Sequence, residues 1–301
     1  MIVREVGPRD GLQSERPVPP TDRARLVTAL AAAGCRRIEA VSFVSEKMVP
    51  AMAGAAEVLS HLDPATMGAG ACRITALVPN VRGAEAALAA GVDELTATIA
   101  ASPVYNERNV HRTIEESISE IGRVCELANH GGVPVDVVIS CAFGSPYEGD
   151  IGAAVVAALV ERVRQKGAGA VTLADTTGMA TPRVLDDVLV ATGIDVGLHL
   201  HETRGTGLLN AYAAMLSGVC RFDTAVGGLG GSPFADGAGG NLATEDFVAV
   251  LDDLGVATGI VLDRLLEASS LARELVGHDL ASRVATAGPR TRLSSAAGSA
   301  S

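Results

Sequence analysis

The sequence predicts an α/β protein folded as a TIM (β/α)8 barrel with additional C-terminal helices. Strand-like and helix-like segments alternate along most of the 301 residues. Eight such pairs fall between residues 1 and 255, which is the size and period of a TIM barrel. The alternative, an open doubly wound sheet, is disfavoured because no G-x-G-x-x-G turn follows the first strand.

The predicted strands are short, apolar and rich in β-branched residues, as a parallel sheet buried on both faces requires. In chain order, strands are predicted at residues 1–6, 36–44, 72–79, 93–100, 134–143, 170–175, 196–202 and 221–228. Each is followed by a predicted helix, at residues 20–34, 51–62, 81–91, 112–132, 150–167, 182–193, 205–218 and 243–255. Several of these helices end on a glycine, which is a common C-terminal signal.

The C-terminal part departs from the barrel pattern. A further helix is predicted at residues 261–277, and residues 286–301 have the composition of a disordered tail. We therefore expect a barrel domain over residues 1–275 and a C-terminal extension over residues 276–301, whose end is disordered.

Composition narrows the classes of function. The net charge of −11 argues against nucleic acid as a partner, because phosphate backbones need basic protein surfaces. The five cysteines include no C-x-x-C pair, which is typical of reduced thiols in the cytoplasm. No uninterrupted apolar run is long enough to cross a membrane, and no targeting segment is expected before the first strand.

In a TIM barrel the active site lies at the C-terminal ends of the strands, which restricts the candidate residues. The predicted strand ends and the loops that follow them carry Arg9, Asp10, Gln13, Glu39, Ser42, Asp175, Thr176, His199, His201, Ser232 and Asn241.

His199 and His201 are the main candidates for metal ligands. Positions i and i+2 of a strand face the same side, so both imidazoles point into the barrel mouth. The alternative is a hydrogen-bonded pair of core histidines. Asp10 is the natural carboxylate ligand, although "RDG" is also good turn chemistry. Two imidazoles with oxygen ligands suit Mg²⁺ or Mn²⁺, and ligand type alone leaves Fe²⁺ and Zn²⁺ open.

Arg9 is the expected partner of the buried carboxylates Glu39 and Asp175, since buried charges need pairing. The alternative is a purely structural layer of ion pairs at the barrel mouth. A Schiff-base aldolase is disfavoured because Lys47 and Lys166 are the only lysines, and neither is expected inside the site.

These residues lie in segments that together resemble the hydroxymethylglutaryl-CoA lyase family of metal-dependent TIM-barrel enzymes. The segments are "EVGPRDGLQSE", "IEAVSFVSEKMVPAM", "SCAFGSPYEG", "LADTTGMATP", "HLHETRG" and "GGLGGSPFADGAGGNLATED", in the family's order. The resemblance spans roughly residues 2 to 275.

The resemblance implies a role for each matching residue. It implies a divalent metal, Mg²⁺ or Mn²⁺, held by Asp10, His199, His201 and Asn241. It implies that Arg9 stabilises an enolate oxygen, that Glu39 supports the site, and that Asp10 or His199 accepts a proton. Neighbouring strand-end residues are expected to contact an acyl-CoA substrate, namely Arg9, Gln13, Ser42, Asp175 and Thr176. A homodimer in the cytoplasm is also implied.

One position departs from the family. The family's loop reads G-G-C-P, and its cysteine is thought to transfer a proton; here that residue is Ser232. A serine hydroxyl is far less acidic than a thiol, whose pKa is near 8.5. Three explanations stay open: another group delivers the proton, the substrate is a different hydroxyacyl-CoA or hydroxy acid, or the protein is a pseudoenzyme that binds metal and acyl-CoA. Ser145 and "HETRG" are further departures.

Overall fold

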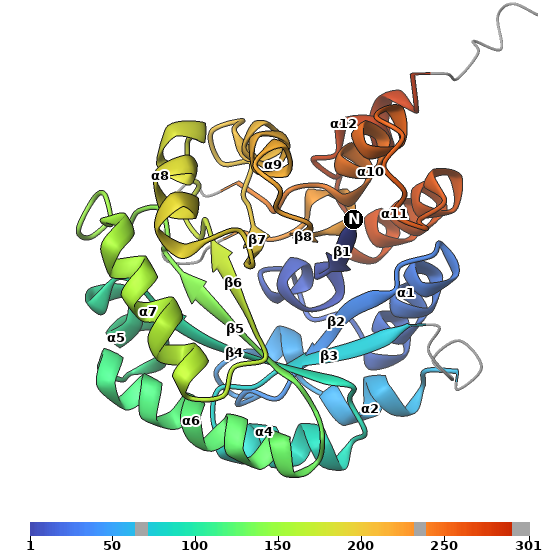
Figure 1. Cartoon of the computed structure of the whole chain (residues 1–301). Coiled ribbons are helices and arrows are strands. Elements are labelled where there is room, and N and C mark those ends of the chain that lie inside the picture. The colour runs from blue at the N-terminus through green and yellow to red at the C-terminus, as the bar shows by residue number, and fades with distance from the viewer. Residues whose placement is uncertain (64–71, 232–238, 291–301) are drawn as a thin grey trace, which may run out of the picture.

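A computed structural model describes residues 1–63, 72–231 and 239–290. Eight parallel strands close into a barrel, each paired with the next and β8 with β1 (Figure 1). The predicted TIM barrel is therefore confirmed. The strands are β1 (Ile2–Glu5), β2 (Arg37–Ser42), β3 (Arg73–Leu77), β4 (Glu94–Ala100), β5 (Val135–Ser140), β6 (Ala170–Ala174), β7 (Gly197–His199) and β8 (Arg221–Thr224).

Helices surround the barrel. They are α1 (Pro20–Ala32), α2 (Ala55–Ser60), α4 (Val81–Ala89), α5 (Pro103–Val110), α6 (Ile114–His130), α7 (Ala153–Gln165), α8 (Pro182–Thr192), α9 (Gly207–Leu216), α10 (Thr244–Asp253), α11 (Leu262–Val276) and α12 (Arg283–Ala287). Among the described residues, no helix combines the length and apolarity needed to cross a membrane.

Local sequence signals explain where several helices begin. Thr113 and Glu116 form a reciprocal capping box at the start of α6. Asn80 caps α4 by accepting a hydrogen bond from the Gly83 N–H. Helices α5 and α8 each have a proline in the first turn, where its missing N–H has no cost.

Two segments differ from the prediction. The single helix predicted at residues 51–62 is a 3-10 turn, η2 (Pro50–Met52), followed by the short α2. Gly54 separates them with a φ of 73°, a left-handed conformation that interrupts a helix. Helix α5 was not predicted, because its sequence, "PVYNERNV", has a weak apolar stripe.

The interior of the barrel is polar, and the hydrophobic core lies between the strands and the helices. Buried apolar side chains of the strands, including Ile38, Leu95 and Val137, belong to one continuous core with apolar helix residues. Alternate strand positions carry buried polar side chains, namely Arg4, Thr75, Thr96, Asp136, Thr172 and Asp223. The strands were expected to be apolar on both faces, so the inner face differs from the prediction.

A short π-helix, η1 (Gly7–Gly11), follows β1 and carries two candidate site residues. The backbone N–H groups of Asp10 and Gly11 both donate to the Val6 carbonyl, at 2.7 and 3.3 Å. Such wide turns are rare and often mark functional sites. This turn places Arg9 and Asp10 at the mouth of the barrel.

The C-terminal helices pack beside the point where β8 meets β1 (Figure 1). Helix α11 packs against α1 and ends at Val276, near the predicted domain boundary. Helix α12 is tied to α10 because Asp246 accepts hydrogen bonds from the Ser282 hydroxyl and from the backbone N–H groups of Arg283 and Val284. Residues 291–301 lie outside the described part of the chain.

Candidate active site

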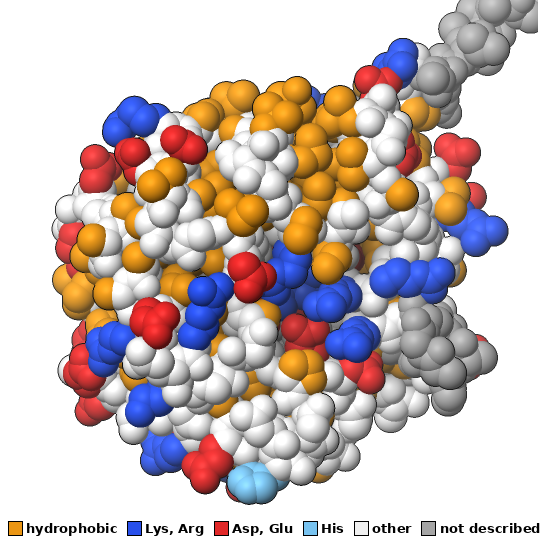
Figure 2. Space-filling view, viewed as in Figure 1, with side chains coloured by type: hydrophobic (Ala, Val, Ile, Leu, Met, Phe, Trp, Pro, Cys, Tyr) orange, Lys and Arg blue, Asp and Glu red, His pale blue; other side chains and the backbone are white. Residues whose placement is uncertain are grey.

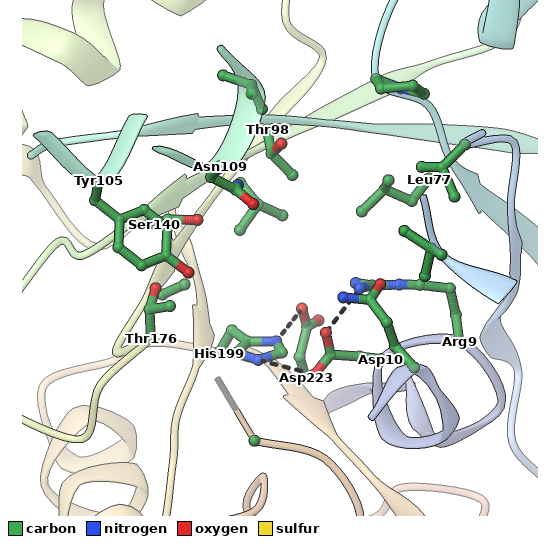
Figure 3. Close-up of a pocket in the computed structure, with 18 of the residues that line it drawn as sticks. Arg9, Asp10, Leu77, Thr98, Tyr105, Asn109, Ser140, Thr176, His199 and Asp223 are labelled. Atoms are coloured by element: carbon green, nitrogen blue, oxygen red, sulfur yellow. Dashed lines mark hydrogen bonds and ion pairs between the residues drawn. The ribbon is translucent and has the colours of Figure 1, made fainter. Parts of the chain in front are cut away.

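A cavity of about 220 Å³ opens at the C-terminal ends of the strands (Figure 3). Arg9, Asp10, His199 and Asp223 lie together on one side of it. The opposite wall carries hydroxyl and amide groups from β4, α5, β5 and the loop after β6, namely Thr98, Tyr105, Asn109, Ser140 and Thr176. Gln13 and His201 also line the cavity. The site therefore has a charged side with two imidazoles and an uncharged polar side.

The two imidazoles are oriented by partners behind them. His199 Nδ1–H donates to Asp223 Oδ2 at 3.2 Å, and His201 Nδ1–H donates to the Gly239 carbonyl at 3.2 Å. Carboxylates and carbonyls only accept, so these contacts set the protonated nitrogen of each ring. The two Nε2 atoms face each other at 3.2 Å.

Asp10 and Asn241 complete this side of the site. Asp10 Oδ2 lies 3.8 Å from His199 Nε2 and accepts a hydrogen bond of 2.8 Å from Asn241 Nδ2. Asn241 Nδ2 also donates to the Leu229 carbonyl at 2.9 Å. Both amide protons of Asn241 are used in this way, which leaves its Oδ1 as the atom for another partner.

Arg9 joins two carboxylates. Its Nε and Nη2 contact Glu39 Oε1, and its Nη1 lies 2.7 Å from Asp10 Oδ1. Both Arg9 and Glu39 are buried, so this pairing compensates charges that water does not reach. Glu39 therefore fixes the guanidinium, which in turn contacts the candidate ligand Asp10.

The donor set fits a divalent metal ion. Among the described residues, Asp10, His199 and His201 each offer one ligand atom, and these atoms lie within 4.8 Å of one another. With both Nδ1 atoms engaged elsewhere, the two Nε2 lone pairs converge on the same space as the Asp10 carboxylate. Two imidazoles with a carboxylate and an amide oxygen form a set that binds divalent ions with open positions.

Charge and burial set the protonation of these groups. Burial alone would raise the pKa of Asp10, but Arg9 and His199 outweigh it and lower that pKa to about 2. Burial, together with the neighbouring His199, lowers the pKa of His201 to about 4. Burial would also lower the pKa of His199, but the hydrogen bond to Asp223 and the Asp10 charge raise it. Asp10 is thus a carboxylate and His201 a neutral imidazole at neutral pH, as metal ligation requires.

Of the predicted substrate-binding residues, the structure brings Arg9, Gln13 and Thr176 to the cavity and sets two apart from its lining. Ser42 is buried at the end of β2 and lines a neighbouring cavity. Asp175 Oδ1 accepts hydrogen bonds from the backbone N–H groups of Met179 and Ala180, so it holds the loop after β6. Burial raises the pKa of Asp175 to about 7. Ser232 lies outside the described residues.

Sequence reasoning missed two residues behind His199. Asp223, on β8, is buried and accepts two hydrogen bonds from Arg4, of 2.8 and 2.7 Å. Arg4, on β1, also pairs with Asp136 on β5 at 2.8 Å. The available signal was a charged residue within an apolar strand, in "IVRE" and "RFDT". Tyr105 and Asn109 were missed because α5 was not predicted.

A TIM barrel with an H-x-H pair, an aspartate and an arginine at its mouth defines the class of metal-dependent TIM-barrel lyases. Sequence comparison agrees, because the model of the HMGL-like family matches residues 1–272. The chain belongs to this family, and it is an enzyme of the lyase type.

The relatives cover nearly the whole chain. The mitochondrial hydroxymethylglutaryl-CoA lyase of Macaca fascicularis is 40% identical over 94% of this chain and 88% of its own. The (R)-citramalyl-CoA lyase of Chloroflexus aurantiacus is 42% identical over 96% of this chain and 95% of its own. The solved structure of an HMG-CoA lyase from Acinetobacter baumannii, in complex with coenzyme A and 3-methylmalate, superposes with a TM-score of 0.91. It is 39% identical and covers 98% of this chain and 97% of that one.

Proposed function

We propose that this protein cleaves 3-hydroxy-3-methylglutaryl-CoA, or a thioester very similar to it, into acetyl-CoA and a ketoacid. The observation that carries the proposal is the convergence of Asp10, His199 and His201 beside Arg9 at the barrel mouth. The relatives named above act on CoA thioesters that carry a tertiary hydroxyl, which supports this substrate class.

The reaction is a retro-Claisen cleavage. The C3 hydroxyl loses its proton, the C2–C3 bond breaks, and its electron pair moves onto C2 and the thioester carbonyl as an enolate. A proton delivered to C2 then completes acetyl-CoA, while C3 becomes the ketone of acetoacetate. Asp10 or His199 would accept the hydroxyl proton. Arg9, held by Glu39, would offset the negative charge that develops on the enolate oxygen.

We propose Mg²⁺ or Mn²⁺ as the metal, held by Asp10, His199, His201 and the Oδ1 atom of Asn241. When bound, the ion supplies Lewis-acid stabilisation and orients the oxygen atoms of the substrate. The uncharged wall formed by Thr98, Asn109 and Ser140 would bind the departing ketoacid by hydrogen bonds. Gln13, Ser42, Asp175 and Thr176 stay candidates for substrate contact, and the cytoplasm stays the proposed compartment.

A second candidate function is the cleavage of a different hydroxyacyl-CoA, such as citramalyl-CoA. The observation that favours it is the citramalyl-CoA lyase relative, which is 42% identical to this chain. Serine in place of the family's cysteine, at Ser232, is consistent with an altered substrate.

The test is an acetyl-CoA release assay over a panel of 3-hydroxy-3-substituted glutaryl-CoA thioesters and citramalyl-CoA. We expect turnover on hydroxymethylglutaryl-CoA that is lost with EDTA and restored by Mg²⁺ or Mn²⁺. Turnover confined to citramalyl-CoA would transfer the assignment to the second candidate. Metal-replete protein that cleaves none of the thioesters would contradict both and support a binding pseudoenzyme.

A further inference from the structure

Helix α9 presents an apolar face that the described chain does not cover. Residues 205–220 include no charged side chain, although the whole protein carries a net charge of −11. The side chains of Gly207, Asn210, Ala211 and Ala214 are buried against the barrel. On the other side, Leu209, Tyr212 and Leu216 are exposed by 53%, 40% and 69%. A surface helix normally carries charges on its solvent face, so a helix without any indicates a contact surface.

The neighbouring helix extends this surface. Val190 on α8 is 80% exposed, and Ile194, just beyond α8, is 49% exposed. Ile194 reaches α9, because a β-carbon added at Gly218 would lie 3.1 Å from its Cδ1 atom. Figure 2 shows hydrophobic side chains gathered over α9, between α8 and the C-terminal helices. We call the exposed side chains of Val190, Ile194, Leu209, Tyr212 and Leu216 the α9 face.

We propose that the α9 face is the contact surface of a homodimer, in which α9 packs antiparallel against α9 of a second copy about a two-fold axis. Leu209, Tyr212 and Leu216 follow the 3-4-7 spacing with which two helices interlock. The small side chain of Ala213 lies among them and leaves room for a facing leucine. A contact about a two-fold axis uses the same face of both copies, so one apolar face provides both halves.

Charges at the two ends of α9 favour this arrangement. Arg204 is exposed immediately before α9, and the Asp195 side chain, 98% exposed, follows Ile194 at the other end. An antiparallel pair places Arg204 of one copy near Asp195 of the second, and it also opposes the two helix dipoles. Asp195 has one cationic neighbour in its own chain, Arg164, at 3.7 Å. Asp186, Asp187 and Asp195 around this face disfavour an anionic membrane as the occupant.

The test is sedimentation velocity on the full chain over a concentration series, comparing glutamate substitutions on and off the α9 face. Leu209→Glu is the main variant. Val155→Glu, on α7, is the matched control, because Leu209 and Val155 are both 53% exposed and the charge change is the same. We expect a wild-type dimer, a dissociation constant raised by at least ~10-fold in Leu209→Glu, and no change in Val155→Glu. Leu216→Glu repeats the test, and circular dichroism and thermal unfolding verify that each variant folds.

Three results would overturn the proposal. The first is a wild-type protein that stays monomeric at micromolar concentration, which would leave the α9 face to a different protein. The second is a dimer that both substitutions on the α9 face leave intact, which would place the interface elsewhere. The third is co-sedimentation of monomeric wild-type protein with phosphatidylcholine–phosphatidylglycerol vesicles that Leu209→Glu abolishes, which would identify the occupant as a lipid surface.

Discussion

Arg9 contacts two carboxylates at once, and a lysine at this position could not. Its fork reaches Glu39 through Nε and Nη2 and Asp10 through Nη1. If it offsets the charge of an enolate, its contribution appears only in the transition state. We expect Arg9→Lys to lower kcat on the thioester substrate by about 10²-fold with little change in KM. Arg25→Lys, on the exposed surface of α1, is the control. A change confined to KM would make Arg9 a binding or structural residue.

Ser232 is the residue at which this chain departs most clearly from its family. A thiol with a pKa near 8.5 can exchange a proton at neutral pH, whereas a serine hydroxyl cannot. We expect Ser232→Cys to raise turnover of hydroxymethylglutaryl-CoA by at least ~10-fold, the low end of what one general acid contributes. Cys220, which is exposed, serves as a reference thiol for modification controls. Unchanged turnover, with good activity on another thioester, would show that the proton comes from a different group.

At the scale of elements, four strands cooperate to orient one imidazole. Asp223 on β8 accepts from His199 Nδ1–H, Arg4 on β1 holds Asp223, and Asp136 on β5 holds Arg4. Thr172 on β6 donates to Asp136 at 2.8 Å. Partners behind a metal-binding histidine fix its orientation, and their loss typically costs 10- to 100-fold in metal affinity. The polar barrel interior therefore extends from the candidate metal site toward the N-terminal end of the barrel.

This arrangement offers a matched pair of variants. Asp223→Asn and Asp136→Asn each remove one carboxylate that pairs with Arg4, so both should destabilise the fold. Only Asp223 touches His199. We expect Asp223→Asn to weaken Mn²⁺ binding by roughly 10-fold or more, measured by calorimetry, and Asp136→Asn to leave it nearly unchanged. Equal losses in the two variants would show that the network affects only stability.

The sequence predicted the elements well where their signal is local. Alternating apolar segments identified the eight strands and most helices, and the H-x-H spacing placed both imidazoles at the barrel mouth. The polar interior was not predictable, because the partners Arg4, Asp136 and Asp223 are far apart in the chain and meet only when the barrel closes. The exclusion of Ser42 from the main cavity depends on a side-chain direction that strand-end position alone does not give.

At the scale of the whole molecule, two buried glutamates lie where β8 meets β1. Glu5 accepts hydrogen bonds from the backbone N–H groups of Gly7 and Val226 and from the Thr244 hydroxyl. Glu245, on α10, accepts from the Gly227 N–H at 2.9 Å. Burial raises the pKa of each carboxyl from an ordinary 4.5 to about 7, and each also raises the other or is raised by a neighbouring carboxylate. Barrel closure and the seating of the C-terminal helices thus depend on groups that titrate near neutral pH.

The sign of the resulting pH dependence follows from these raised pKa values. Between pH 4.5 and 7 the folded chain keeps protons that the unfolded chain releases, so the free energy of unfolding falls as pH rises and stays low above pH 7. A shift of this size corresponds to about 2–3 kcal/mol per group. We expect Glu245→Gln to flatten this fall, with stability similar to wild type at pH 5 and higher by up to ~2 kcal/mol at pH 8. Urea unfolding of metal-free protein at both pH values measures the difference, and Glu85→Gln on the exposed side of α4 should leave it unchanged. A difference between Glu245→Gln and wild type that is the same at pH 5 and pH 8 would mean that Glu245 is already ionised in the fold.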